Sequence, residues 1–294
     1  ILCCAFYKRK RKKQRSKKYL KEIQGLVDKN YKEVTLLGQN VDSYLWYGGG
    51  LKKDFKKISD FRKKTAINFA KLLKLIAKTF SNTRIRFSTS NPQDMSLEVI
   101  KTMSNHSNIC KHIHLPVQSG SDKILKSMNR KHSRSEYLEL IKKIKELMPD
   151  CAISHDMISG FPNESEEDHK LTLDLMDQVK YEFGYMFKYS ERPGTLAYKK
   201  HKDNIPEQIK KRRLQEIVDL QQKHSLYRTS SYIGEKVRVL IEKESKKSAN
   251  QWSGRNEQNT VVVFDKEKFK IGDFVDVTIT NCTSATLIGN TTNS

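Results

Sequence analysis

Short apolar runs, each followed by a polar loop that contains glycine or proline, recur along this chain of 294 residues. Helical patterns follow most of these loops, and alternating strands and helices are typical of a parallel sheet. The carboxyl ends of parallel strands meet at one edge, where α/β barrels and doubly wound folds hold their ligands. The alternation therefore predicts an α/β fold with an enzyme site built from five loops, at residues 37–40, 88–92, 116–122, 159–164 and 190–195.

The hydrophobic pattern also predicts where the elements lie. Strands are expected at 33–37, 84–87, 111–115, 152–158 and 183–189. Helices are expected at 97–103, 122–128 and 135–147, after a cap at Ser165, and from Pro206 to about Ser230. One further helix face is formed by Phe69, Leu72, Leu73, Ile76 and Phe80. Residues 45–64, with Gly48, Gly49 and Gly50 and many lysines, are interpreted as an inserted surface loop.

The pattern changes near residue 230. Short strands separated by turns are expected at 237–241, 260–264, 274–280 and 285–288, which predicts a small all-β barrel. The chain is therefore expected to divide into an α/β domain at residues 1–229 and a β domain at residues 230–294. The second domain is nearly neutral, with nine Lys plus Arg against eight Asp plus Glu, or +1, which leaves +21 of the total +22 for residues 1–229.

This charge indicates a polyanionic partner. Nucleic acid is favoured over a membrane surface, because the sequence shows no amphipathic basic helix. A lysine-rich bias that decorates every surface is the alternative interpretation. No run of 18 apolar residues predicts a membrane span. The five cysteines are odd in number and scattered, which argues against a disulfide framework and for a reducing compartment. The chain begins with Ile1, not methionine, and no signal-peptide pattern follows, so a fragment or processed product is expected.

Three polar residues suit an anionic ligand that contains adenosine. Gln118 ends one predicted strand, Arg130 follows the next helix, and Asp156 lies inside the strand after that. A guanidinium group pairs with a carboxylate, while amide and carboxylate groups hydrogen-bond a ribose. An aspartate within an apolar strand is costly unless it is paired. A purely structural role for two of the three residues is the alternative.

Several co-linear motifs carry a resemblance to a known family. These motifs are 37–41 (LGQNV), 114–122 (HLPVQSGSD), 128–130 (MNR), 156–164 (DMISGFPNE) and 189–195 (YSERPGT). They resemble the radical S-adenosylmethionine tRNA methylthiotransferases, and the first is most similar to the type that acts on isopentenyladenosine. The segment 253–255 with Asn259 resembles the TRAM domain that ends these proteins. Enzymes of the threonylcarbamoyladenosine type are the alternative branch.

The resemblance implies a partial α/β barrel, followed by the TRAM barrel, with S-adenosylmethionine bound across the open edge. Residues implied to contact this cofactor are Gln118, Ser119, Arg130 and Asp156, with Gly38, Gln39 and Asn40 near its amino acid end and Gly160 near the adenine. The implied chemistry adds a methylthio group to carbon 2 of the base beside the tRNA anticodon. It uses two four-iron four-sulfur (4Fe–4S) clusters and an electron donor such as a ferredoxin or flavodoxin. A monomer in the cytoplasm or an organelle is expected.

The chain departs from this family at the cluster loop, where C-x-x-x-C-x-x-C is implied. Cys3 and Cys4 are adjacent, and Cys4 lies about where the last loop cysteine belongs. Two neighbouring cysteines cannot supply three ligands, so the chain as written is expected not to build the cluster. Two interpretations remain: a truncated portion of a full enzyme, or a non-catalytic RNA-binding relative.

Candidates for RNA contact lie in both domains. Arg192 lies in a loop at the presumed cleft mouth and can hold phosphate, while Trp252 beside Arg255 can stack on a base. Trp46 and Tyr47 are further stacking candidates. The basic run at 8–18 is either a solvated tail or a phosphate-binding arm. His112 and His114 are expected on opposite faces of a strand, and so not to form a metal pair.

Overall fold

The structure, a computed structural model, describes residues 2–3, 16–38, 40–49, 52–88 and 90–292. Gln39 and Cys4, two of the residues predicted to bind cofactor and metal, therefore lie outside the described residues. None of the described helices is both long enough and apolar enough to cross a bilayer.

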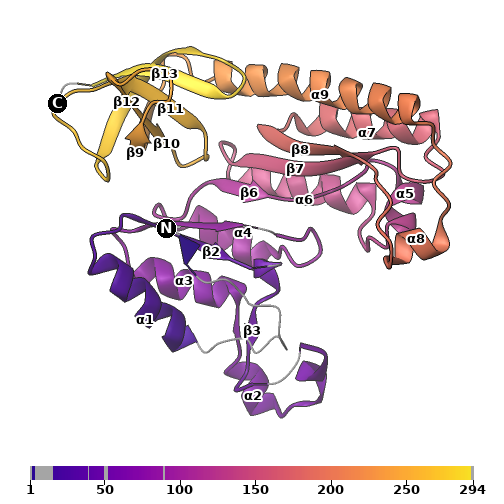
Figure 1. The fold of residues 1–294 in the computed structure, drawn as a ribbon. Coiled ribbons are helices and arrows are strands. Elements are labelled where there is room, and N and C mark those ends of the chain that lie inside the picture. The colour runs from indigo at the N-terminus through magenta and orange to yellow at the C-terminus, as the bar shows by residue number, and fades with distance from the viewer. Residues whose placement is uncertain (1, 4–15, 39, 50–51, 89, 293–294) are drawn as a thin grey trace.

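Two three-stranded parallel sheets form the first part of the chain (Figure 1). One has the order β1 (Leu2–Cys3), β2 (Glu33–Leu37), β5 (Arg84–Ser88), and the other the order β6 (His112–His114), β7 (Ala152–Ser159), β8 (Phe183–Lys188). Backbone hydrogen bonds of 2.8 Å from Ile85 N to Asn108 O and 2.9 Å from Cys110 N to Ile85 O connect them just before β6. The result is one curved, open parallel sheet, which confirms the predicted partial α/β barrel.

Helices cover the outer face of this sheet, and most of them present an apolar stripe to it. The last and longest helix differs, because it buries mainly polar side chains such as Lys210, Arg213 and Gln221. They are α1 (Ser16–Val27), α3 (Phe69–Thr79), α4 (Leu97–Ser104), α5 (Asp122–Ser127), α6 (Arg134–Leu147), α7 (Glu166–Val179) and α9 (Glu207–Ser230), with the short α8 (Leu196–Lys200) between α7 and α9. The predicted face of α3 is buried. The predicted cap is present too, since Ser165 Oγ accepts a 3.2 Å hydrogen bond from Asp168 N.

The inserted segment is more ordered than the sequence indicated. After the turn η1 (Val41–Ser43), it contains β3 (Leu45–Trp46), η2 (Lys52–Lys57) and α2 (Asp60–Lys64). The strand β3 pairs with β4 (Ile67–Asn68), which follows the segment. Tyr47 is buried against Phe55, with ring centroids 5.4 Å apart, and Trp46 packs against the main core. The aromatic side chains fold this segment back onto the domain, so the prediction of a plain surface loop was wrong. The buried Tyr47 ring is not accessible to a base, while Trp46 is half-buried.

A closed five-stranded barrel forms the carboxyl-terminal part. Its order is β10 (Gln251–Arg255), β11 (Val261–Asp265), β13 (Thr286–Thr291), β12 (Phe274–Cys282), β9 (Lys236–Glu244). The sequence did not predict β10, whose polar residues show no apolar alternation. Gly254 is required there because a Cβ atom would lie 2.1 Å from Leu240 O on the neighbouring strand.

Two buried arginines of β5 join the core to the barrel. Arg84 donates hydrogen bonds to the carbonyl oxygens of Arg255 (2.9 Å) and Arg238 (3.0 Å). Arg86 donates to the carbonyls of residues 256 (2.6 Å) and 257 (3.2 Å) and, through Nε, to Glu33 Oε1 (2.9 Å). Burial and the neighbouring Arg86 lower the pKa of Arg84, and Glu33 opposes that effect. The barrel is thus attached through charged groups that the core alone leaves incompletely satisfied.

We expect Arg86→Met to lower the free energy of unfolding by about 3–5 kcal/mol, because it leaves the Glu33 carboxylate buried beside a single remaining guanidinium. Chemical denaturation monitored by circular dichroism measures this loss. Arg212→Met is the matched control, since Arg212 forms ion pairs with Glu166 and Glu216 while 44% exposed. Equal stability of the two variants would contradict the role given to Arg86.

Candidate active site

Polar side chains line the inner face of the second sheet. Ser154 Oγ lies 3.0 Å from His112 Nε2 and 2.9 Å from His114 Nδ1. The other nitrogen of His114, Nε2, lies 3.3 Å from Asp156 Oδ1. His112 and His114 therefore share one face, and their expected placement on opposite faces was wrong, because residues two apart in a strand point the same way.

The surroundings of these side chains determine the charge of His112. Burial, with added repulsion from Arg86 and His114, lowers the pKa of His112 to about 3, so His112 is neutral near pH 7. Ser154 Oγ bridges the two imidazole rings, since it lies within hydrogen-bond distance of a nitrogen of each. His114 Nε2 lies within ion-pair distance of Asp156 Oδ1. The row fixes Asp156 Oδ1 and leaves Oδ2 without a hydrogen bond from any described residue.

Gln118 and Arg130 lie beside this aspartate. Gln118 has a left-handed φ of 80°. Its backbone pairs with β7 through hydrogen bonds of 2.9 Å from Gln118 N to Asp156 O and 3.0 Å from Ile158 N to Gln118 O. Its residue is only 5% exposed, yet its side-chain amide makes no hydrogen bond with a described residue. Arg130 is exposed as a residue, yet partial desolvation of its guanidinium lowers its pKa and the charge of Asp156 raises it, which places the guanidinium in the field of that carboxylate. The three predicted residues thus come together.

Other buried polar atoms without partners among the described residues follow neighbouring strands. They are Asn40 Oδ1 after β2, Ser90 Oγ after β5 and the Tyr189 hydroxyl after β8. Asn40 follows the half-buried Gly38, has a φ of 70° and donates from Nδ2 to Asp94 Oδ2 at 2.6 Å. Ser90 and Tyr189 were not among the predicted site residues, although Ser90 lies in the predicted loop 88–92 and Tyr189 ends the predicted strand 183–189. Buried unpaired polar groups are costly, so this edge suits a polar ligand.

Two further residues predicted to contact the cofactor, Gly160 and Ser119, have hydrogen-bond partners within the protein. Gly160, with a φ of 71°, donates its N–H to Glu164 Oε2 at 2.7 Å, and that carboxylate forms a buried 2.9 Å ion pair with Arg213. Ser119 is fully buried, and its hydroxyl lies 3.3 Å from Thr172 Oγ1 on α7. Its side chain therefore contacts α7, away from the group around Asp156.

The described residues do not fit an iron–sulfur cluster. No three His, Cys, Asp or Glu side chains among them are grouped so that they can hold a metal. Burial raises the pKa of both Cys110 and Cys151 to about 12, so neither thiol is a ready ligand. Cys282 lies in the barrel.

The predicted RNA-binding residues lie apart. Arg192 is exposed in the loop before α8, which lies at the far end of the core from the barrel (Figure 1). Trp252 packs partly against the barrel core, with Lys266 Nζ 4.4 Å from the centre of its ring system. Arg255 is half-exposed and forms a 2.8 Å ion pair with Glu242. Of these three residues, only Arg255 lies near both domains, because its carbonyl oxygen accepts a hydrogen bond from Arg84.

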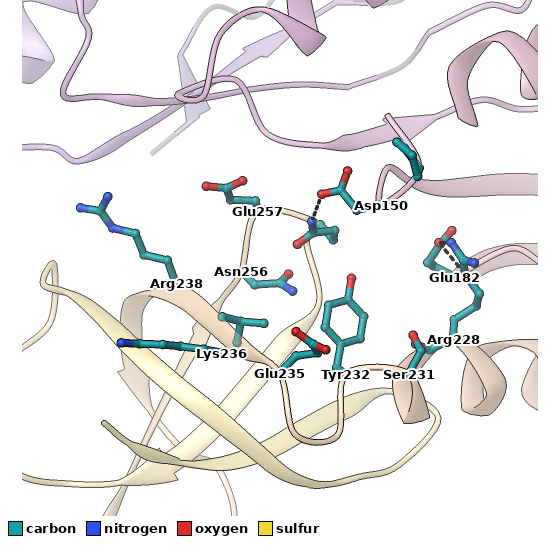
Figure 2. A pocket seen from close by; sticks show the side chains of 13 residues that line it. Asp150, Glu182, Arg228, Ser231, Tyr232, Glu235, Lys236, Arg238, Asn256 and Glu257 are labelled. Atoms are coloured by element: carbon teal, nitrogen blue, oxygen red, sulfur yellow. Dashed lines mark hydrogen bonds and ion pairs between the residues drawn. The ribbon is translucent and has the colours of Figure 1, made fainter. Parts of the chain in front are cut away.

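A cavity of about 560 Å³ separates the barrel from the core beside this junction. Figure 2 shows Asp150 of the core facing the barrel loop, where its Oδ2 accepts a 2.9 Å hydrogen bond from Gln258. Acidic and basic groups both line the cavity, and Glu182 and Arg228 are paired with each other there. None of the predicted site residues lines it, so it is separate from the group around Asp156.

Comparison with known proteins agrees with this architecture. The sequence matches the radical SAM superfamily over residues 2–176 and the TRAM domain over residues 230–291. The chain belongs to the radical SAM superfamily.

The curated relatives of this chain point to one type of enzyme within that superfamily. The chain is 64% identical over 288 residues to the tRNA-2-methylthio-N(6)-dimethylallyladenosine synthase of Christiangramia forsetii, and 59% identical over 288 residues to that of Flavobacterium johnsoniae. Each alignment covers 98% of this chain and 60% of the relative, so the chain spans about 60% of the length of these proteins. The resemblance to methylthiotransferases is confirmed. Among solved structures, coproporphyrinogen III oxidase (HemN) from Escherichia coli is 14% identical, with a TM-score of 0.47, over 82% of this chain and 60% of that chain.

A buried clamp holds the loop that carries Gln118. Ser121 Oγ donates to Asp168 Oδ1 at 2.6 Å, and Lys123 Nζ lies 2.7 Å from Asp168 Oδ2. Burial opposes the charge on Asp168, but the hydrogen bonds from Lys123, Ser121 and Ser165 lower its pKa from 3.8 to about 2. The ionised clamp therefore stabilises the fold above pH 3.8, and this contribution is lost as the pH falls toward 2.

We expect the chain to lose about 1–2 kcal/mol of stability from this clamp between pH 4 and pH 2, and Asp168→Asn to remove that part of the pH dependence. Urea denaturation across this range measures the effect. Asp219→Asn, an exposed carboxylate on α9, should keep the wild-type dependence. An unchanged profile for Asp168→Asn would show that the clamp does not contribute.

Proposed function

We propose that this chain is the S-adenosylmethionine-binding and TRAM portion of a tRNA methylthiotransferase that modifies carbon 2 of isopentenyladenosine beside the anticodon. The observation that carries the proposal is the convergence of Gln118, Arg130 and Asp156 at the carboxyl edge of the sheet. The printed names of the curated relatives support the choice of reaction and base.

The residues fit the chemistry of S-adenosylmethionine. Arg130 supplies a guanidinium for the carboxylate of the amino acid part, near Gly38 and Asn40 at the end of β2. The free Oδ2 of Asp156 and the unpaired amide of Gln118 supply an acceptor and a donor for ribose hydroxyls. When bound, S-adenosylmethionine supplies the methyl and adenosyl groups that the reaction needs. The row from His112 to Asp156 holds the carboxylate in one orientation before the cofactor binds.

The clusters and the electron donor belong to the longer protein in this proposal. The described residues supply no cluster site, so no catalytic step of this chain is assigned to one. What this chain contributes is the position of the cofactor and a surface for the tRNA.

Arg130→Ala and Asp156→Asn should each weaken binding of S-adenosylmethionine about tenfold to a hundredfold, because each removes a charge-assisted hydrogen bond. Isothermal titration calorimetry measures the affinity. Lys131→Ala, an exposed neighbour of Arg130, is the matched control and should bind as wild type. Wild-type affinity in both test variants would remove these residues from the cofactor site.

In a protein that contains this chain together with the remaining part of its relatives, tRNA should gain 2-methylthio-isopentenyladenosine. Nucleoside mass spectrometry of tRNA from cells that lack their own enzyme detects the product. Arg130→Ala should abolish the product while tRNA binding persists. A methylthio group found on threonylcarbamoyladenosine would instead assign the protein to the other branch.

A further inference from the structure

A strip of aromatic side chains lies on the inner face of β8, which is the edge strand of its sheet. Phe183 stacks on His112, with ring centroids 5.3 Å apart and planes at 16°, and its edge contacts Tyr185 at 6.3 Å. Tyr185 and Phe187 are 56% and 54% exposed. In the sheet register Tyr185 pairs with Asp156, so the strip begins beside the proposed cofactor site. Exposed aromatic rings in a row mark a binding surface.

A cavity of about 400 Å³ continues from this strip toward the barrel. Phe183 and Tyr185 line it from β8, Arg228 from α9, and Arg255 and Asn259 from the barrel. It therefore combines aromatic faces and amide groups with two guanidinium groups, which are paired with Glu182 and Glu242. It lies between the two domains that Arg84 and Arg86 hold in place.

A second cavity of about 320 Å³ lies on the barrel and shares Arg255 and Val261 with the first. Its rim adds Lys243, Lys246 and Lys247, which are exposed and form no ion pair with another described residue. The acid that lines it, Glu242, is already paired with Arg255. The barrel is nearly neutral as a whole, so these three lysines are a local concentration of positive charge.

We propose that the two cavities form one continuous track for single-stranded RNA, with bases stacked on the Tyr185 strip and phosphates held by Lys243, Lys246 and Lys247. The proposal rests on the proposed function, since it names the path that the nucleotides flanking the modified base follow. Single-stranded segments are bound by aromatic platforms combined with basic grooves, and this is the chemistry that the track offers. The stacking end lies beside Asp156, and the phosphate end lies on the barrel.

The stacking end is tested with Tyr185→Ala in the 294-residue chain. The probe is a fluorescein-labelled RNA hairpin with the anticodon stem-loop sequence, and the measurement is fluorescence anisotropy. Loss of one stacked base should weaken binding about tenfold, and Tyr185→Phe should restore it. Tyr227→Ala is the matched control, because Tyr227 is a 58% exposed tyrosine of α9 that lines neither cavity. Equal affinity of Tyr185→Ala and Tyr227→Ala would overturn the stacking assignment.

The phosphate end is tested with the double variant Lys246→Gln and Lys247→Gln. Each lost phosphate contact should reduce the slope of log affinity against log salt by about 0.7. Lys268→Gln, an exposed lysine of the barrel outside both cavities, should leave the slope unchanged. A blunt RNA duplex should bind less tightly than the hairpin, and equal binding would overturn the preference for single strands.

Binding of S-adenosylmethionine separates this proposal from the proposed function. Tyr185→Ala should keep wild-type affinity for the cofactor while losing affinity for RNA. If RNA affinity is unchanged and cofactor binding still depends on Arg130, the track is wrong and the proposed function stands. A loss of cofactor affinity in Tyr185→Ala would assign the residue to the cofactor site and also overturn its place in the track.

Discussion

The guanidinium groups of Arg84 and Arg86 lie on the inner face of β5 and share the carboxylate of Glu33, with nitrogen–oxygen distances of 3.8 Å and 2.9 Å. One carboxylate cannot compensate two buried like charges, so the barrel supplies the remaining acceptors as backbone carbonyls. Those carbonyls belong to residues 238 and 255–257, so the same bonds set the position of the barrel loop that follows β10. The arrangement of the whole molecule depends on this contact. The hydrogen bonds from Gln258 to Asp150 and from Thr229 to Thr283 O, of 2.9 Å and 2.8 Å, add to it and help to place Arg255 and Asn259 beside β8.

Polar side chains on the same inner face extend from the junction with the barrel to Asp156 at the proposed ligand site. The charge of Arg86 adds to the effect of burial on His112, which lowers the pKa of that histidine and keeps it neutral. Ser154 bridges His112 and His114, and His114 in turn lies beside Asp156. The arginines that attach the barrel therefore also help to fix the carboxylate at the far end of the row.

Much of this could be predicted from the sequence because local periodicity determines it. The bounds of β2 and the buried face of α3 follow from alternation and helical spacing, and the co-linear motifs identified the family. What failed depends on tertiary packing. Residues 251–255 show no alternating apolar pattern, because Gly254 is required by the close approach of the neighbouring strand. The roles of Arg84 and Arg86 could not be predicted from the sequence, because their hydrogen-bond acceptors are backbone carbonyls of the second domain.

Charge is divided between the domains in a way that suits their separate roles. The field that attracts a polyanion comes from residues 1–229, which carry +21 of the total +22. Such a field raises the rate of encounter but does not choose a register, because it acts over about a Debye length. Register requires short contacts at fixed positions, and the proposal assigns them to Lys243, Lys246 and Lys247 on the nearly neutral barrel. Because Arg84 and Arg86 hold the barrel rigidly against the sheet, the separation between those lysines and Asp156 is fixed. In the proposed RNA track, the length of the RNA between the two ends therefore determines which nucleotide lies beside Asp156.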